Sequence, residues 1–116
     1  MTAVLPANTD ADTLRALLTQ TLAGRAGAGC AVICLCAAWC GACREFQPGF
    51  ERAAAEHPHA VFRWLDIEDE AAALGDIDVE TFPTLVIGGP DGQPRFAGPV
   101  PPQPAQIARL LQSLGL

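Results

Sequence analysis

The sequence predicts one α/β domain with a central mixed sheet of about four strands flanked by helices. Segments with helical apolar spacing alternate with short apolar runs, a pattern typical of a parallel βαβ arrangement. A turn-rich segment at 88–92 lies between two further short runs and adds an antiparallel hairpin. A length of 116 residues suits one domain spanning 1–116, with 1–8 as a loose N-terminal segment.

The first half of the chain predicts a helix and a buried strand. Thr9 or Asp10 can cap the helix, which carries leucines at helical spacing and ends at Gly24. The continuous apolar run 30–37 then predicts a strand covered on both faces.

A second helix is predicted from Cys43 to about Glu56, with Pro48 expected to kink it after its first turn. A strand at 60–67 and a short helix at 68–74 follow.

The last third of the chain predicts the hairpin and a C-terminal helix. The hairpin strands are expected at 84–87 and 93–97. The proline-rich segment 101–104 then opens the final helix. The buried face of that helix is expected to carry Ile107, Leu110, Leu111 and Leu114.

Composition excludes several classes of partner. Seven basic and 13 acidic side chains give a net charge of −6, which argues against nucleic-acid binding. The charge-free stretch 26–43 is interrupted by glycines and suits a buried strand better than a membrane span. Residues 1–12 contain two acids and no positive side chain, unlike a secretory signal, so we expect a cytoplasmic protein without a membrane partner.

The cysteines are concentrated in one short segment. An odd number of them in a chain expected to be cytoplasmic indicates thiol chemistry or metal binding rather than a framework of structural disulfides. The five are Cys30, Cys34, Cys36, Cys40 and Cys43.

Cys40 and Cys43 enclose Gly41 and Ala42 between the predicted strand and the second helix. Unpaired N–H groups at a helix N-terminus favour an anion, which lowers the pKa of a thiol placed there. The spacing lets the two sulfurs join as a disulfide across one turn. We therefore expect Cys40 to attack a substrate disulfide and Cys43 to resolve the mixed disulfide. Zinc sites use the same spacing, so a metal site stays open at this point.

The residues around this pair resemble the thioredoxin family. Trp39 precedes the first cysteine, Arg44 follows the second, and Pro48 comes five residues after it. Farther on, the segment Thr81-Phe82-Pro83-Thr84 is similar to the cis-proline loop of the family. The resemblance extends over about residues 10–116 and also includes Asp66, at the end of the second predicted strand, and Gly98, after the hairpin.

The resemblance implies how substrate is held. The Pro83 loop is expected to lie against the disulfide, with the backbone of Phe82 pairing with an extended substrate. Trp39, Gly98 and the two residues between the cysteines, Gly41 and Ala42, complete the expected substrate-binding set. The implied partners are protein disulfides and a recycling reductase. A monomer is expected, with no metal and no cofactor beyond the redox-active disulfide Cys40–Cys43.

Two departures from the family pattern bear on activity. Ala42 stands where Pro is commonest and restores an N–H that favours the Cys40 thiolate, so we expect a couple more oxidising than that of thioredoxin. Cys34 replaces a buried Asp, and Phe62 replaces its Lys partner. Because the Asp and the Lys are missing together, no buried charge is left without a partner. Without the Asp as a general base for Cys43, we expect slower catalysis.

Three interpretations of function remain. The first is a thiol–disulfide oxidoreductase; the second is a thioredoxin-like binding or assembly factor with little turnover; the third is a metal-binding cysteine protein. Cys34 and Cys36 share one strand face. They are either small buried hydrophobes or residues that exchange with the active-site pair or complete a metal site. Cys30 receives no role.

Overall fold

A computed structural model describes residues 11–24, 27–37, 41–67, 84–100, 103 and 105–116. Its elements confirm the predicted α/β class and their predicted order. They are α1 (Ala11–Ala23), β1 (Cys30–Cys36), α2 (Gly41–Glu56), β2 (Ala60–Asp66), β3 (Thr84–Gly88), β4 (Pro94–Pro99) and α4 (Ala105–Ser113). The predicted N-terminal segment 1–8 and the predicted helix 68–74 lie outside the described residues.

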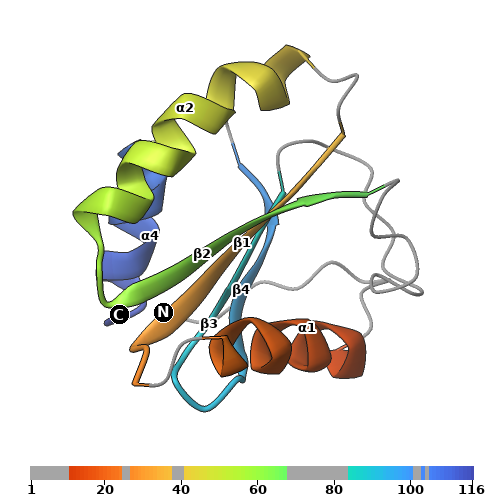
Figure 1. The fold of residues 1–116 in the computed structure, drawn as a ribbon, viewed down its shortest axis with the longest axis vertical. Helices are drawn as coiled ribbons and strands as arrows, with labels where there is room; N and C mark the ends of the chain where they lie inside the picture. The colour runs from red at the N-terminus through yellow and green to blue at the C-terminus, as the bar shows by residue number, and fades with distance from the viewer. Residues whose placement is uncertain (1–10, 25–26, 38–40, 68–83, 101–102, 104) are drawn as a thin grey trace.

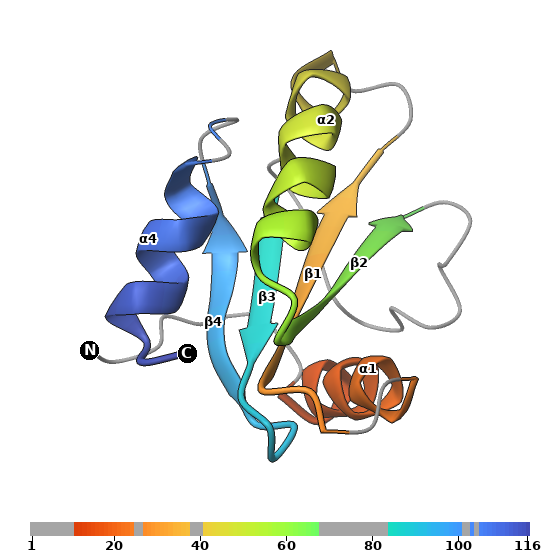
Figure 2. The same cartoon turned by 60° about the vertical axis from the view of Figure 1, so that its left-hand side comes forward.

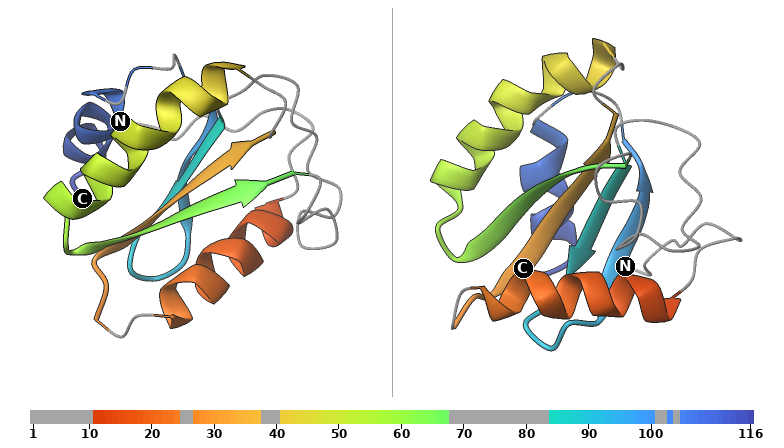
Figure 3. Two further views of the ribbon diagram at one scale, coloured as in Figure 1. Left: turned by 45° about the horizontal axis from the view of Figure 1, so that its top comes forward. Right: turned by 45° about the vertical axis from the view of Figure 1, so that its right-hand side comes forward.

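The four described strands form one mixed sheet in the order β2-β1-β3-β4. β1 pairs with β2 in parallel, whereas β3 pairs with β1 and β4 in antiparallel register. α2 and α4 cover one face of the sheet, and α1 lies across the opposite face (Figures 1 and 3). This arrangement makes β1 an interior strand with a neighbour on both edges and a helical layer on both faces.

β1 is the most deeply buried element. All seven of its residues are at most 1% exposed. Val32 and Cys34 face the core beneath α2 and α4, whereas Ile33 and Leu35 face the core beneath α1. A strand buried on both faces has no polar alternation, which explains its continuous apolar sequence and confirms the prediction.

α2 begins at Gly41, two residues before the predicted start, and continues through Pro48 to Glu56. Pro48 is exposed, so its ring lies on the solvent side of α2. A kink at Pro48 stays a prediction.

Phe50 anchors α2 to the sheet. Its ring centroid lies 6.0 Å from that of Phe46, 5.2 Å from that of Phe62 and 5.5 Å from that of Trp64. The two contacts with β2 have the edge-to-face geometry that aromatic pairs prefer. Phe62, where the resemblance implies a Lys, therefore contributes to an aromatic cluster between α2 and β2.

α1 is held to the sheet by leucines and by one arginine. Leu14, Leu17 and Leu18 are at most 2% exposed, as their spacing predicts. Arg63 of β2 donates from Nη1 to Thr21 Oγ1 at 3.3 Å, joining this edge strand to the end of α1.

α4 packs against the opposite face less completely than predicted. Ile107 and Leu111 are buried, whereas Leu110 and Leu114 are only partly buried. None of the described helices is long and apolar enough to cross a membrane.

Two glycines shape the hairpin between β3 and β4. A Cβ on Gly88 would lie 2.6 Å from Leu18 Cδ1 of α1, so a larger residue there would force this buried leucine side chain to shift. Gly92 has a φ of +79° at the turn, a conformation that other residues rarely adopt.

The predicted limits of the last strand were wrong, because it runs from Pro94 to Pro99 instead of 93–97. Gly98 is therefore a residue of β4 that pairs with Leu85, and does not follow the hairpin. Local turn residues marked where the strand begins, but its length depends on pairing with β3.

Phe50→Ala should lower the free energy of unfolding by about 3–5 kcal/mol, because it leaves a cavity among three aromatic rings. Urea unfolding measures this loss, and Gln47→Ala, at an exposed position of the same helix, is the matched control. The control should change stability by no more than about 0.5 kcal/mol. Equal losses in the two variants would contradict the anchoring role of Phe50.

Stability should fall in alkaline solution partly through Cys30. Burial raises the pKa of the Cys30 thiol above its ordinary value of 9.0. The stability that this buried neutral thiol contributes is therefore complete below its pKa in the unfolded chain, and it is lost as pH rises through its pKa in the folded chain. Under reducing conditions, urea unfolding should weaken more between about pH 8 and about pH 10 for the native chain than for Cys30→Ala. Parallel losses would show that this thiol does not contribute.

Candidate active site

The described parts of the predicted site gather at one end of the sheet. Leu35, near the end of β1, pairs with Thr84, the residue directly after Pro83 in the sequence. Cys36 pairs with Asp66 on the other edge of β1. Gly98 lies opposite the second residue of β3. Segments that are far apart in the sequence therefore meet at the end of the sheet where β1 ends.

α2 starts at this same end of the sheet, above the tip of β1 (Figure 2). Gly41 is its first residue and is exposed, and Ala42 is half-buried. Cys43 lies in the first turn and is only 2% exposed. The first turn of a helix carries unpaired N–H groups and a partial positive charge, so this end of α2 favours an anion.

The structure describes half of the predicted site residues. Gly41, Ala42 and Cys43 lie together in the first turn of α2, and Gly98 lies in β4 at the same end of the sheet. A Cβ on Gly98 would lie 3.7 Å from Phe96 Cζ, an ordinary contact, so the described residues do not require glycine there. The other predicted residues, Trp39, Cys40, Phe82 and Pro83, lie outside the described residues.

The core beneath Cys43 is apolar. Cys43 belongs to the buried cluster beneath α2 and α4 that also contains Cys34 and Cys36. Among the described residues, the only buried polar side chains are Thr21 and Thr84. That part of the chain therefore holds no buried carboxylate to take a proton from Cys43.

The four described cysteines, Cys30, Cys34, Cys36 and Cys43, are all buried, and no disulfide joins any two of them. The Sγ atoms of Cys34 and Cys36 lie 3.3 Å apart, which confirms that they share one face of β1. Within the described ranges, no group of three or more His, Cys, Asp or Glu side chains is placed to hold a metal ion.

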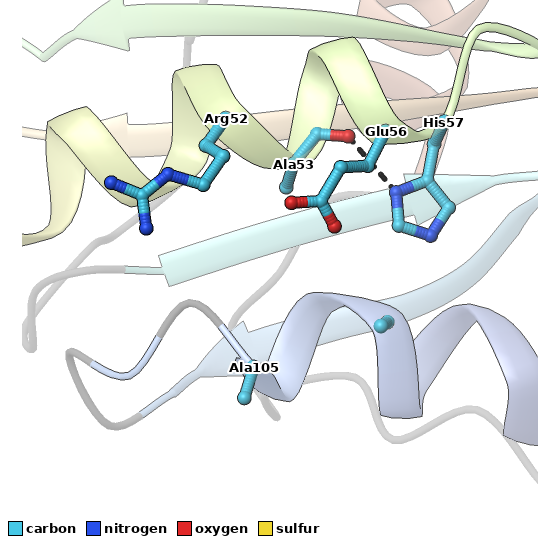
Figure 4. Close-up of a pocket in the computed structure, with 7 residues that line it drawn as sticks. Arg52, Ala53, Glu56, His57 and Ala105 are labelled. Atoms are coloured by element: carbon cyan, nitrogen blue, oxygen red, sulfur yellow. Dashed lines mark hydrogen bonds between the residues drawn. The ribbon is translucent and has the colours of Figure 1, made fainter.

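A shallow pocket of about 200 Å³ lies elsewhere, between α2 and α4 (Figure 4). Arg52, Glu56 and His57 line it from α2 and its C-terminal end, and Ala105 lines it from α4. His57 Nδ1 donates to the Ala53 carbonyl at 2.9 Å, so this nitrogen carries the proton. Arg52 and Glu56 are exposed on α2. No local signal in the sequence indicates a pocket there, because only the fold brings α4 to these residues.

Comparison with known proteins matches the family model for thioredoxin over residues 20–110. The chain is 37% identical over 51 residues to a putative thioredoxin 2 of Streptomyces coelicolor, covering 44% of this chain and 38% of that protein. It is 31% identical over 68 residues to a thioredoxin of Chlamydia trachomatis, covering 59% of this chain and 67% of that protein.

The fold is also similar to solved structures. The thioredoxin of Fasciola hepatica superposes with a TM-score of 0.70 at 23% identity, covering 82% of this chain and 88% of that one. The matches to curated proteins cover less of the partner, and the matched segments span only 38–50% of the length of the first three relatives. The family model nevertheless extends from the end of α1 into α4. The chain therefore belongs to the thioredoxin family.

Proposed function

We propose that this protein is a thiol–disulfide oxidoreductase that exchanges dithiol for disulfide with protein substrates through Cys40 and Cys43. Membership of the thioredoxin family and the thioredoxin fold suggest this class of activity. The observation that carries the proposal is the position of Cys43, buried in the first turn of α2 directly beyond the end of β1.

Cys40 is the proposed nucleophile. It directly precedes Gly41, the first residue of α2. A thiolate near a helix N-terminus is stabilised by the unpaired N–H groups and by the helix dipole, so its pKa is lowered. Cys43 is nearly inaccessible at 2% exposure, which suits a sulfur that reacts only within the protein.

The proposed reaction has two exchange steps. The Cys40 thiolate attacks one sulfur of the substrate disulfide, forming a mixed disulfide and releasing the other substrate sulfur as a thiolate. Cys43, after losing its proton, attacks the Cys40 sulfur, forms the Cys40–Cys43 disulfide and releases the second substrate thiolate. The substrate gains two electrons, and a recycling reductase must return two electrons to the pair.

The proposed substrate groove is formed by Trp39, Phe82, Pro83 and Gly98. Support comes from the pairing of Thr84 with Leu35, because it brings the residue after Pro83 to the end of β1 from which the chain leads to Cys40. Extended substrate would pair with the backbone of Phe82. We also propose that the protein acts as a cytoplasmic monomer and needs no cofactor beyond its redox cysteines.

The core predicts a slow second step. No buried carboxylate is present among the described residues, and Phe62 packs on Phe50 where a Lys is expected in the family. Water is then the proton acceptor for Cys43. The same observation favours a second candidate function, a binding or assembly factor that grips its partner but turns over little.

Reduction of insulin disulfides by dithiothreitol separates the two candidates. The native chain should accelerate the reaction, and Cys40→Ser should reduce the rate to the uncatalysed background because it removes the nucleophile. Cys30→Ala is the matched control and should retain the native rate, since this cysteine is buried at the far end of β1.

A native rate equal to background would contradict the enzyme. Partner retention by Cys40→Ser in the same preparation would then support the binding factor. If the enzyme is correct, Cys43→Ser should accumulate mixed disulfides on Cys40, and mass spectrometry of these adducts identifies the substrates.

Ala42→Pro should make the redox couple more reducing. The backbone N–H of Ala42, the second residue of α2, favours the Cys40 thiolate and hence the reduced form of the couple. Proline removes this N–H. The first turn tolerates proline, so the fold should persist. Equilibration with glutathione should show a larger oxidised fraction for the variant than for the native chain at the same poise. Ala42→Ser is the control, because serine keeps the backbone N–H at this position. Ala55→Pro is unsuitable as a control, because a proline there would lie in the interior of α2. An unchanged or smaller oxidised fraction in Ala42→Pro would refute the role of this N–H.

A further inference from the structure

The outer edge of β2 has no partner strand in the described part of the chain, because β2 is the first strand in the sheet order β2-β1-β3-β4 (Figure 3). Such an edge presents N–H and C=O groups to which another extended chain can bind. Two hydrogen bonds identify the residues that carry these groups. Ile67 N–H donates to the Cys36 carbonyl at 2.9 Å, and the His59 carbonyl accepts from Gly29 N–H at 2.7 Å. The backbone groups of residues 59 and 67 therefore point toward β1.

The backbone groups of Phe62 and Trp64 point away from β1. In an extended strand the N–H and C=O of one residue point to the same edge, and successive residues alternate between the two edges. Since residues 59 and 67 point toward β1, Arg63 and Leu65 do so as well. Phe62 and Trp64 therefore present their N–H and C=O groups at the open edge of the sheet.

The two sides of this edge differ in chemistry. Phe62 and Trp64 are half-buried and pack against Phe50 on the α2 side of the sheet. On the α1 side, a pocket of about 330 Å³ adjoins the same part of β2. Its lining residues come from the end of α1 and from β2, and they are Gln20, Thr21, Gly24, Val61, Phe62 and Arg63. The edge is therefore apolar on one side and carries a cation on the other.

Arg63 is held in this pocket by neutral partners. Its Nη1 donates to Thr21 Oγ1 at 3.3 Å and to Gln20 Oε1 at 3.4 Å. Thr21 is buried, and its hydroxyl donates to the Leu17 carbonyl at 2.8 Å, which fixes the acceptor that Arg63 uses. Both contacts of Arg63 involve one guanidinium nitrogen, so the N–H groups of Nε and Nη2 can bind a carboxylate that enters the pocket.

We propose that the outer edge of β2 binds an extended segment of a partner protein, with an acidic side chain of that segment placed against Arg63. The backbone of the segment pairs with that of Phe62 and Trp64. Side chains alternate along the segment, so apolar ones cover the two aromatic rings and a carboxylate lies on the Arg63 side. The site lies toward the start of β2, whereas Asp66 at the other end meets Cys36 at the candidate active site. Binding at this edge therefore does not depend on the redox pair.

Amide hydrogen exchange of the free chain, measured by NMR, tests whether the edge is open. The amides of Phe62 and Trp64 should exchange faster than those of Arg63 and Leu65, which point toward β1. Slow exchange of all four amides at every protein concentration would show that the chain's own residues cover the edge. Protection that increases with protein concentration would show that a second copy covers it. Either result overturns the proposal.

A short synthetic peptide of alternating valine and glutamate, capped at both ends, is the probe for binding. Its addition should slow exchange at Phe62 and Trp64 and leave Arg63 and Leu65 unchanged. A peptide with lysine in place of glutamate should bind about threefold to fivefold more weakly, because it loses the charge pair. The net charge of −6 by itself favours the lysine peptide, so preference for glutamate identifies a local contact with Arg63. Equal or reversed affinities, or no binding of either peptide, would overturn the proposal.

Variants assign the preference to one side chain. Arg63→Gln should remove the preference for glutamate, and Arg63→Glu should reverse it. Arg52→Gln removes the same charge from an exposed position of α2 and is the matched control, so it should keep the native preference. An unchanged preference in Arg63→Gln would refute the contact between the peptide and Arg63. Titration of the native chain with the two peptides decides whether the site exists even if one of the variants does not fold.

Discussion

The complete burial of β1 is the constraint on which the remaining structure depends. This strand has a partner on each edge and a helical layer on each face, so each of its seven residues is at most 1% exposed. Backbone groups in such a position must pair within the sheet, because water does not reach them. The register of β1 with β2 and β3 therefore determines what lies beside its end, where Leu35 meets Thr84 and Cys36 meets Asp66.

The candidate site uses the point at which this rigid strand passes into α2. A helix that starts directly beyond a fixed strand holds its first-turn N–H groups in one place, so their attraction for a thiolate requires little reorganisation. Cys43 is buried below that turn. Among the described residues, the packing that secures this turn is apolar and holds no buried carboxylate.

The interior replaces charge with sulfur and aromatic rings. At Cys34 and Phe62, where the resemblance implies an ion pair, the structure has a thiol 3.3 Å from that of Cys36 and a ring packed against Phe50. Burying an ion pair carries a large desolvation cost, and a well-packed apolar substitute is often as stable. The substitution also places Cys34 in the same buried cluster as Cys36 and Cys43, beneath α2.

Local pattern was sufficient to predict the type and order of the described elements, because periodicity and turn residues act over a few neighbours. The roles of Cys40 and Cys43 stay predictions. Local pattern failed where distant segments cooperate. The length of β4, and with it the place of Gly98 within a strand, follows from pairing with β3. Packing between elements likewise produces the close approach of Gly88 to Leu18 and the pocket between α2 and α4. The 3.3 Å sulfur contact belongs to both levels: alternation along a strand puts Cys34 and Cys36 on one face, but the surrounding core turns their side chains toward each other.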